Sequence, residues 1–354
     1  MIPGLTDDAA RECLIRVPYS AFPTLFSVCK LWRQELRDPT FHRFRKSTGI
    51  AQPVVVMVQP YCTYDNCPGL MVYRFVIFEP ATGVWSSLPP CPNLTHGLPH
   101  LCRLAPVGTE LVVVGGWKID TCVTTDEVHV YDFVSGEWRR GSPLPWPLRS
   151  SFACAATHDS DKGWRTVYVA GGHDGRANPL RSALAYDVGG DSWKPLPDMA
   201  RKPFNCRGVI LRGKFVVLHR HCAEAFDPAA GSWGPVEELV PPGEQYPTIC
   251  VAGVDGSIYR CVGREVMVQL DGGVWATVSK LPSEMRVVMN AVAWEGKLMV
   301  MGIGMRNGAL VAKILDIKAT TTMTTPASAS ASWRNVEVPP EYQWHVEVAC
   351  CLVI

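Results

Sequence analysis

The chain repeats one short fragment, and this repetition constrains its fold more than any other feature. "FEPATGVW" begins at residue 78, "YDFVSGEW" at 131, "YDVGGDSW" at 186 and "FDPAAGSW" at 226. In each copy an acid follows an aromatic residue, and tryptophan stands seven positions after the aromatic. The acid can hydrogen-bond the backbone of a turn, and the tryptophan supplies a large apolar surface that can pack between neighbouring repeats.

Short apolar segments complete the repeating unit. Between residues 151 and 197 they read "FACAATH", "TVYVAGGH", "SALAYDV" and "DSWKPLP", and residues 100–145 repeat the same order. Gly, Pro and Asp separate the segments and no helical period intervenes, which is typical of four short strands joined by turns. Weaker copies follow, the last expanded by "KATTTMTTPASASAS", which is typical of a flexible loop.

The number of units follows from the tryptophans at positions 85, 138, 193, 233, 275 and 333. A period of about 40–55 residues with four strands per unit predicts a β-propeller, here with six blades. The first unit, residues 54–89, lacks an inner strand, whereas the final segment "WHVEVACCLVI" has the character of one. We therefore predict that this segment completes the first blade and closes the ring.

Fourteen cysteines raise the question of disulfides or metal sites. Cys102, Cys154, Cys206 and Cys250 lie 52, 52 and 44 residues apart, close to the repeat period, and each stands in an apolar segment. A cysteine that recurs once per repeat is most simply a small buried residue at an equivalent core position. We expect these thiols to be reduced, as they are in the cytosol.

Composition narrows the classes of function. A net charge of +1 argues against nucleic-acid binding, and the apolar runs are too short to span a bilayer. No secretory signal is visible, so we expect a soluble protein of the cytoplasm, the nucleus or both.

No enzyme motif or phosphate-binding loop is recognisable either, and we expect no catalytic residue and no cofactor. His219, His221 and Cys222 are close in sequence. No second ligand pair stands at zinc spacing, so we also expect no metal.

The first 46 residues differ from the rest. Thr6 is a candidate helix N-cap, Pro18 ends the first periodic run, and Asp38 followed by Pro39 begins another. The pattern predicts three short amphipathic helices over residues 1–46, a linker over 47–53 and the propeller over 54–354. Such a prefix can be a cap that covers one edge of the propeller, or a separate interaction module.

Two resemblances bear on that choice. The double glycines, the aromatic residues and the spaced tryptophans resemble the kelch repeat over roughly residues 53–354. The prefix, with "IPGLTDDAARECLIRVP" and "VCKLWRQELRDPTF", resembles the F-box, the motif that docks on a Skp-family adaptor. Pro3-Gly4-Leu5 replaces the usual Leu-Pro start. The resemblance implies adaptor contacts from Leu5, Leu14, Val17, Pro18, Val28, Cys29, Trp32 and Leu36.

An F-box followed by kelch repeats implies the substrate-recognition subunit of an SCF-type ubiquitin ligase. The adaptor would link it to a cullin, and the propeller would hold a protein substrate near an enzyme supplied by other subunits. The alternatives are a kelch scaffold protein without ubiquitin chemistry, and a small-molecule receptor or metabolic enzyme. Neither alternative needs an adaptor-docking prefix.

The substrate is expected on one rim of the propeller, in the loops that enter the inner strands. Arg149 lies five residues before Cys154, Arg201 five before Cys206, and Arg286 four before Asn290 at the corresponding place in its unit. Equivalent positions of successive blades converge on one rim, so a partly basic, aromatic ring is predicted. Isolated arginines that only solvate the rim are the alternative. The candidate substrate-binding residues are His100, Arg149, Arg201, Lys202, Phe204, Tyr246 and Arg286.

A narrower resemblance points to a target. "GLPHLCRLAPVGTELVVVGG", "VYVAGGHDG", "AYDVGGDSWKPLPDMARKPFNCRGV" and "DDAARECLIR" are similar to the plant F-box/kelch subgroup that ubiquitinates phenylalanine ammonia-lyase. The similarity implies a negative regulator of phenylpropanoid biosynthesis. Related plant proteins take chalcone synthase or other metabolic enzymes, so the target stays open between these.

Overall fold

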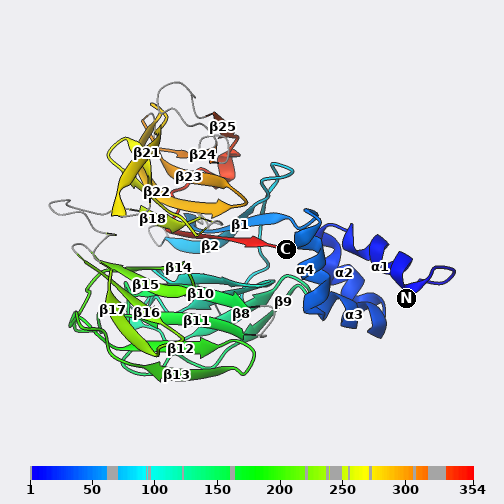
Figure 1. Cartoon of the computed structure of the whole chain (residues 1–354), viewed down its shortest axis with the longest axis horizontal. Helices are drawn as coiled ribbons and strands as arrows, with labels where there is room; N and C mark the ends of the chain where they lie inside the picture. Colours follow the sequence, from blue (N-terminus) through cyan, green and yellow to red (C-terminus); the bar gives the residue numbers. More distant parts are fainter. Residues whose placement is uncertain are drawn as a thin grey trace.

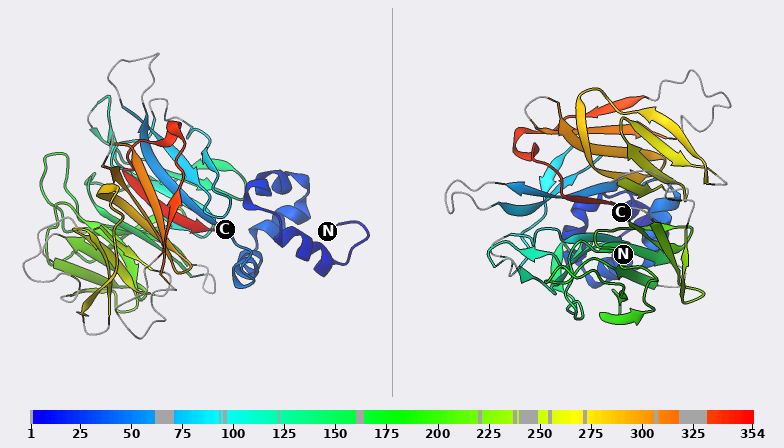
Figure 2. Two further views of the ribbon diagram at one scale, coloured as in Figure 1. Left: turned by 90° about the horizontal axis from the view of Figure 1, so that it is seen from above. Right: turned by 90° about the vertical axis from the view of Figure 1, so that its left-hand side faces the viewer.

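The structure is a computed structural model of the chain (Figure 1). It describes residues 2–61, 71–92, 94, 97–121, 123–159, 164–219, 222–236, 239, 249–253, 256–270, 273–305, 308–317 and 332–354. Within these residues a bundle of short helices stands on one side of a large β-structure, and Figure 2 shows the helices next to the C-terminus.

The β-structure consists of six four-stranded antiparallel sheets, as the repeat predicts. From the inner to the outer strand, the first three blades are β26 (Val348–Val353), β1 (Pro53–Tyr61), β2 (Val72–Phe78) and β3 (Trp85–Ser87); β4 (Arg103–Val107), β5 (Glu110–Val114), β8 (Val128–Asp132) and β9 (Glu137–Arg140); and β10 (Ala153–Asp159), β11 (Trp164–Ala170), β12 (Ala183–Asp187) and β13 (Ser192–Leu196).

The other three blades follow the same order. They are β14 (Arg207–Leu211), β15 (Lys214–His219), β16 (Cys222–Asp227) and β17 (Ser232–Pro235); β18 (Ile249–Ala252), β19 (Ile258–Val262), β20 (Glu265–Gln269) and β21 (Trp275–Lys280); and β22 (Met285–Trp294), β23 (Lys297–Gly304), β24 (Leu310–Asp316) and β25 (Trp333–Val336). A two-stranded ribbon, β6 (Trp117–Lys118) with β7 (Val123–Thr124), decorates the loop between β5 and β8.

The ring is closed by the end of the chain. Strand β26 pairs antiparallel with β1, with Val54 opposite Leu352 and Val58 opposite Val348. The last strand in sequence thus becomes the innermost strand of the first blade, between the inner strands β22 and β4 of its neighbours. This confirms the predicted closure.

Five of the six repeated tryptophans bond their blade to the one before it, whereas the indole Nε1 of Trp275 in the fifth blade has no hydrogen-bond partner among the described residues. The indole Nε1 of Trp138 in the second blade donates a 2.9 Å hydrogen bond to the carbonyl of Pro89, just beyond the first blade. Equivalent bonds run from Trp193 to Ser142 and from Trp233 to Pro197, at 2.9 and 2.7 Å. Across the seam, Trp85 donates to Glu337 of the sixth blade, and Trp333 donates to Lys280 of the fifth.

In the second and fourth blades the acid of the repeated fragment organises the turn before the tryptophan. The Oδ1 of Asp132 accepts a 2.9 Å bond from the backbone of Val134, and Asp227 accepts an equivalent bond from Ala229. Gly136 and Gly231 take φ of 73° and 64° in these turns, a left-handed conformation that glycine adopts without strain.

The recurring cysteines are core residues, as expected. Cys102 and Cys206 are both 1% exposed, and Cys154 is half-buried in β10. None of the three forms a disulfide. Burial raises the pKa of Cys154 to about 12 and that of Cys206 to about 11, so both thiols are protonated near neutral pH. The side chain of Cys250 lies outside the described residues.

The helical module consists of α1 (Asp7–Ile15), a 3₁₀ turn η1 (Tyr19–Ala21), α2 (Phe22–Val28), α3 (Lys30–Arg37) and α4 (Pro39–Ser47). The side chains of Thr6 and Asp38 cap α1 and α4, as the sequence predicts. The second of the three expected helices is split in two, because Cys29 adopts an extended conformation with φ of −159° and ψ of 169°. No helix in the described part of the chain is long and apolar enough to cross a membrane.

Candidate partner-binding surfaces

The propeller has two rims with different loops. We call lower rim the one formed by the loops between the first and second and between the third and fourth strands of each blade. The upper rim holds the loops that enter the inner strands and those between the second and third strands. The helical module lies against the lower rim, where Tyr19 contacts Phe133 edge-on at 5.9 Å between ring centroids. The upper rim is therefore free of the helices.

A shared apolar core fixes the module on the lower rim. Ile15, Phe22 and Phe41 are fully buried and belong to the same cluster as Val56 of β1 and Leu111 of β5. Because the module and the first two blades share this core, the helices and the propeller form one packed body rather than two parts joined by a tether.

A buried arginine ties the helices to the seam of the ring. Arg45 is fully buried, and its guanidinium donates to the carbonyls of Ile15 and Val17 and, at 3.4 Å, to that of Ile354. Burial lowers the pKa of Arg45 to about 10, so the group keeps its charge at neutral pH. The module is thus anchored to the residues that follow the closing strand.

The helical module also exposes several apolar side chains. Val28 is 55% exposed, Leu31 56%, Leu5 45% and Phe44 41%. In a small helical module, large apolar side chains that point to solvent mark an interaction surface. We call this set the module's apolar face.

The structure sorts the predicted adaptor-binding residues into two groups. Leu5, Pro18 and Val28 are exposed, and Val17, Cys29 and Trp32 are half-buried. Leu14 and Leu36 are 2% and 0% exposed and belong to the core shared with the propeller. This corrects the sequence-based interpretation of these two leucines, which hold the helices in place rather than reach a partner.

Sequence reasoning missed Leu31 and Phe44. The predicted helix runs without a break through Cys29, and its apolar stripe leaves Leu31 out. The extended conformation of Cys29 reorients α3, so that Leu31 is exposed while its neighbour Trp32 packs against the core. A signal existed only in the size of the two apolar side chains among polar neighbours.

On the upper rim, Arg149 does not present its charge to solvent. Its side chain is 1% exposed and donates to the carbonyl of Ser182 at 2.9 Å and to its hydroxyl at 2.8 Å. Burial lowers the pKa of Arg149 to about 10. The guanidinium thus braces two loops of the third blade, which corrects the expectation that it contacts a substrate.

The remaining predicted residues differ in exposure. Arg201, Lys202 and Arg286 are exposed, and Arg286 lies in β22 rather than in a loop. Phe204 is 43% exposed and stacks on His173 at 4.4 Å. Tyr246 lies outside the described residues.

His100 is held by neighbours on the seam side of the upper rim. Its ring lies 5.2 Å from that of Tyr73, and its Nε2 lies 3.4 Å from Oε1 of Glu347. Burial lowers the pKa of His100, so the neutral imidazole is favoured. The side chain is 39% exposed, which leaves part of the ring accessible.

Several large apolar side chains on the upper rim were not anticipated. Trp146, in the loop that enters the third blade, is 86% exposed, and Met305 is 60% exposed. We define the upper-rim patch as the exposed apolar and basic residues Trp146, Phe204, Val287, Met305, Trp344, Arg201, Lys202 and Arg286. Aromatic and arginine side chains are enriched at protein interfaces.

The sequence cluster around Cys222 has a simple geometry. Its Sγ lies 3.9 Å from Nδ1 of His219, across the pair of strands β15 and β16. His221 lies outside the described residues. Within the described ranges, no group of three or more His, Cys, Asp or Glu side chains is placed to hold a metal ion.

Comparisons with known proteins agree with the geometry. The kelch motif matches residues 100–145 and 165–200. The chain is 36% identical to the F-box/kelch-repeat protein At1g15670 of Arabidopsis thaliana, over 100% of this chain and 99% of that protein. It is 35% identical to the F-box/kelch-repeat protein At1g80440 of the same plant, with the same coverage.

Among solved structures, the one entitled "Structure of YjhT" is similar with a TM-score of 0.54. The match covers 74% of this chain and 91% of that one, at 13% sequence identity. At this identity the likeness concerns the fold alone, and it supports the propeller.

Proposed function

The chain belongs to the F-box/kelch-repeat proteins, and we propose that it is the substrate-recognition subunit of a Skp–cullin–F-box ubiquitin ligase. The module's apolar face binds the Skp-family adaptor, through which a cullin is reached. The upper-rim patch binds the protein substrate. The subunit itself is non-catalytic and acts in the cytoplasm, the nucleus or both.

One observation carries this proposal: the two exposed surfaces belong to opposite ends of a single packed body. The helices share a core with the first two blades, and the loops of the upper rim lie at the other ends of the same strands. A receptor built in this way holds its substrate at a fixed place relative to the adaptor. A fixed place raises the effective concentration of the substrate near the transferring enzyme.

For the substrate we propose phenylalanine ammonia-lyase, and thereby a negative role in phenylpropanoid biosynthesis. The support is the resemblance of the second and third repeats and of α1 to the plant subgroup that acts on this enzyme. Chalcone synthase or another metabolic enzyme is the second candidate, because relatives with the same architecture act on such targets. A few side chains of the upper-rim patch can decide between them, since exposed aromatic and arginine side chains dominate binding energies at interfaces.

The adaptor arm of the proposal is tested with the double variant Val28→Asp and Leu31→Asp. Both side chains are more than half exposed, so the substitutions leave the core intact. We expect loss of co-purification of a Skp-family adaptor and cullin with the full-length chain. Val274→Asp, at a position 60% exposed in the fifth blade, is the matched control. Equal adaptor recovery with both variants would contradict the assignment.

The same double variant traps the substrate. A full-length receptor that cannot reach the adaptor should retain its target instead of passing it on for degradation. We expect affinity capture from plant tissue with the proteasome blocked to enrich phenylalanine ammonia-lyase. Enrichment of chalcone synthase instead would identify the second candidate, and enrichment of neither enzyme would refute the metabolic role while leaving the ligase assignment in place.

A further inference from the structure

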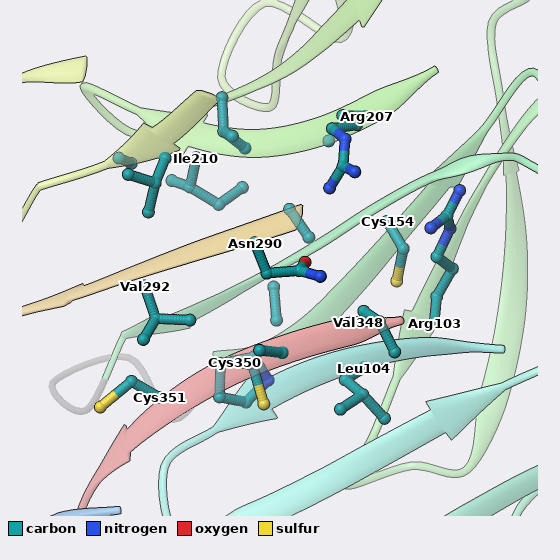
Figure 3. A pocket seen from close by; sticks show the side chains of 18 of the residues that line it. Arg103, Leu104, Cys154, Arg207, Ile210, Asn290, Val292, Val348, Cys350 and Cys351 are labelled. Carbon is teal, nitrogen blue, oxygen red and sulfur yellow. The ribbon is translucent and has the colours of Figure 1, made fainter. Parts of the chain in front are cut away.

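The inner strands of all six blades surround a cavity of about 260 Å³ on the propeller axis (Figure 3). This volume is just below the range of pockets that hold drug-sized ligands. The cavity is distinct from the upper-rim patch and from the module's apolar face, since none of their residues line it.

Polar side chains from alternate blades meet in one part of this cavity. Arg103 and Arg207 come from the start of the inner strands β4 and β14, and Asn290 comes from β22. Figure 3 shows the three side chains directed towards the same end, with Cys154 between the two arginines. The second, fourth and sixth blades thus each supply a hydrogen-bonding group.

Bonds to backbone carbonyls hold Arg103 and Asn290 in position. The Nε of Arg103 donates a 2.9 Å bond to the carbonyl of Phe152, which fixes the plane of its guanidinium. Asn290 is 4% exposed, and its Nδ2 donates a 2.8 Å bond to the carbonyl of Val346. Asn290 also stands where three earlier repeats have Cys102, Cys154 and Cys206, so a polar amide takes the place that the half-buried Cys154 has in the cavity lining of the third blade.

The charge of the lining is positive. No carboxylate occurs among the described residues that line the cavity. The thiols of Cys154 and Cys351 add no negative charge, because burial raises the pKa of each to about 12. Glu347, next to the lining residue Val348, lies close enough to Arg103 for the two groups to interact, but burial raises the pKa of its carboxyl to about 7, so it carries only part of a negative charge near neutral pH. Two guanidinium groups in a confined space therefore favour an anion.

The opposite part of the cavity is apolar. Ile210 lies three residues after Arg207 on β14, and Val292 lies two residues after Asn290 on β22. Figure 3 shows both side chains at the end away from the arginines. Inorganic phosphate would not fill this apolar end. Transfer of an apolar group from water into it would contribute favourable binding free energy.

We propose that the central cavity binds a small organic carboxylate, with the carboxylate between Arg103 and Arg207 and an apolar body against Ile210 and Val292. Arginine recognises carboxylates through paired N–H donors, and the walls accept a body of one or two rings. This site is independent of the proposed ligase function, because it uses neither of the two protein-binding surfaces. It would give the receptor a binding site for a metabolite.

The test uses the full-length protein and 2-naphthoate as the probe. We expect 2-naphthoate to bind with one-to-one stoichiometry in calorimetry. The uncharged 2-naphthamide, which has the same shape, is expected to bind at least about tenfold more weakly because it loses the charge-assisted bonds. Equal binding of the acid and the amide, no binding of the acid at millimolar concentration, or equal competition by inorganic phosphate would overturn the proposal.

Variants locate the site. Arg207→Gln should weaken 2-naphthoate binding about tenfold, and the exposed control Arg176→Gln should leave it unchanged. Ala293→Leu narrows the apolar end without a change of charge, so it should also weaken the acid. Each variant is compared after its circular dichroism spectrum has shown the native fold. Wild-type affinity for 2-naphthoate in both cavity variants would contradict the site. If either variant does not fold, the comparison of 2-naphthoate with 2-naphthamide on the wild-type protein tests the proposal.

Discussion

The phenolic hydroxyl of Tyr19 donates a 2.6 Å hydrogen bond to Oε1 of Glu79. Tyr19 belongs to the 3₁₀ turn between α1 and α2, and Glu79 is the acid of the repeated fragment in the first blade. In the second and fourth blades the acid at this position accepts a hydrogen bond from a backbone N–H of its own turn. In the first blade it also binds the helical module, so one repeat position has acquired a second role.

The first prediction concerns this bond. Tyr19→Phe should lower the free energy of unfolding by about 1–3 kcal/mol, because the carboxylate of Glu79 then loses a donor at a largely buried contact. Hydrogen exchange of α1 and α2 should rise more than that of the blades. Ser20→Ala, an exposed neighbour, is the control. Unchanged exchange in the helices would show that the apolar core alone fixes the module.

The second prediction concerns the upper-rim patch. The double variant Lys202→Glu and Arg286→Glu should reduce substrate capture at least about tenfold, because both cations are exposed and reversing them opposes an acidic partner surface. Lys194→Glu on the outer strand β13 changes charge away from this rim and should capture normally. Normal capture by the double variant would direct attention to the lower rim.

The third prediction separates Arg149 from those cations. Arg149→Gln should destabilise the fold by about 1–3 kcal/mol, because the carbonyl and hydroxyl of Ser182 lose their donors in a buried site. Substrate capture per folded molecule should not change. Urea unfolding and capture assays on the same preparation measure the two effects, and a selective loss of capture would restore Arg149 as a contact residue.

The fourth prediction is a pH dependence. Burial raises the pKa of Glu347 to about 7, and its Oε2 has no hydrogen-bond partner among the residues that the structure describes. Since the folded state holds this proton more tightly than the unfolded state, whose pKa is about 4.3, the group costs stability as pH rises through about 7. Glu347→Gln should therefore be more stable than wild type at pH 8, by on the order of 2 kcal/mol, and the advantage should shrink towards pH 5.

The difference between wild type and Glu347→Gln at each pH cancels the contribution of titratable groups that do not interact with Glu347. Burial lowers the pKa of His100 and that of His345, and Arg103 lies close enough to Glu347 to favour its carboxylate. Urea midpoints measured from pH 5 to pH 8 give the difference. A constant difference over this range would contradict the raised pKa of Glu347.

The fifth prediction concerns the seam. Deletion of residues 345–354 removes β26, leaves the inner edge of β1 unpaired and takes the Ile354 carbonyl from Arg45. We expect loss of the cooperative unfolding transition and aggregation through the open edge. Removal of ten residues from the low-complexity stretch, 320–329, is the matched control and should leave the transition intact. A stable, monomeric propeller without residues 345–354 would contradict closure by this strand.

The ring of blades was predictable because its signals are local and repeated. Tryptophan at a constant distance from an aromatic–acid pair identifies the outer strand of a unit. The first unit lacks an inner strand in its own sequence, and the segment at residues 344–354 can supply one. The direction of the inter-blade bonds was not predictable, because the carbonyl that accepts from Trp138 lies 49 residues earlier in the chain.

Side-chain direction limited the prediction of the sites. Arg149 and Arg201 occupy equivalent sequence positions, yet only Arg149 finds Ser182 within reach and turns inward. Leu14 matches the motif for adaptor docking, but its side chain is buried in the core that the helices share with the propeller. Such outcomes depend on residues brought together by the tertiary fold, which a single sequence does not place.

The pairing of β26 with β1 sets the order in which the molecule can be finished. A ribosome releases β1 early, yet the strand that pairs with its inner edge follows the strands of all the other blades in the sequence. The first blade in synthesis is thus the last to be completed, and the helices anchored beside it through Arg45 and Ile354 reach their final support at the same moment. Full docking of the helices therefore has to wait until β26 has been made and has paired with β1.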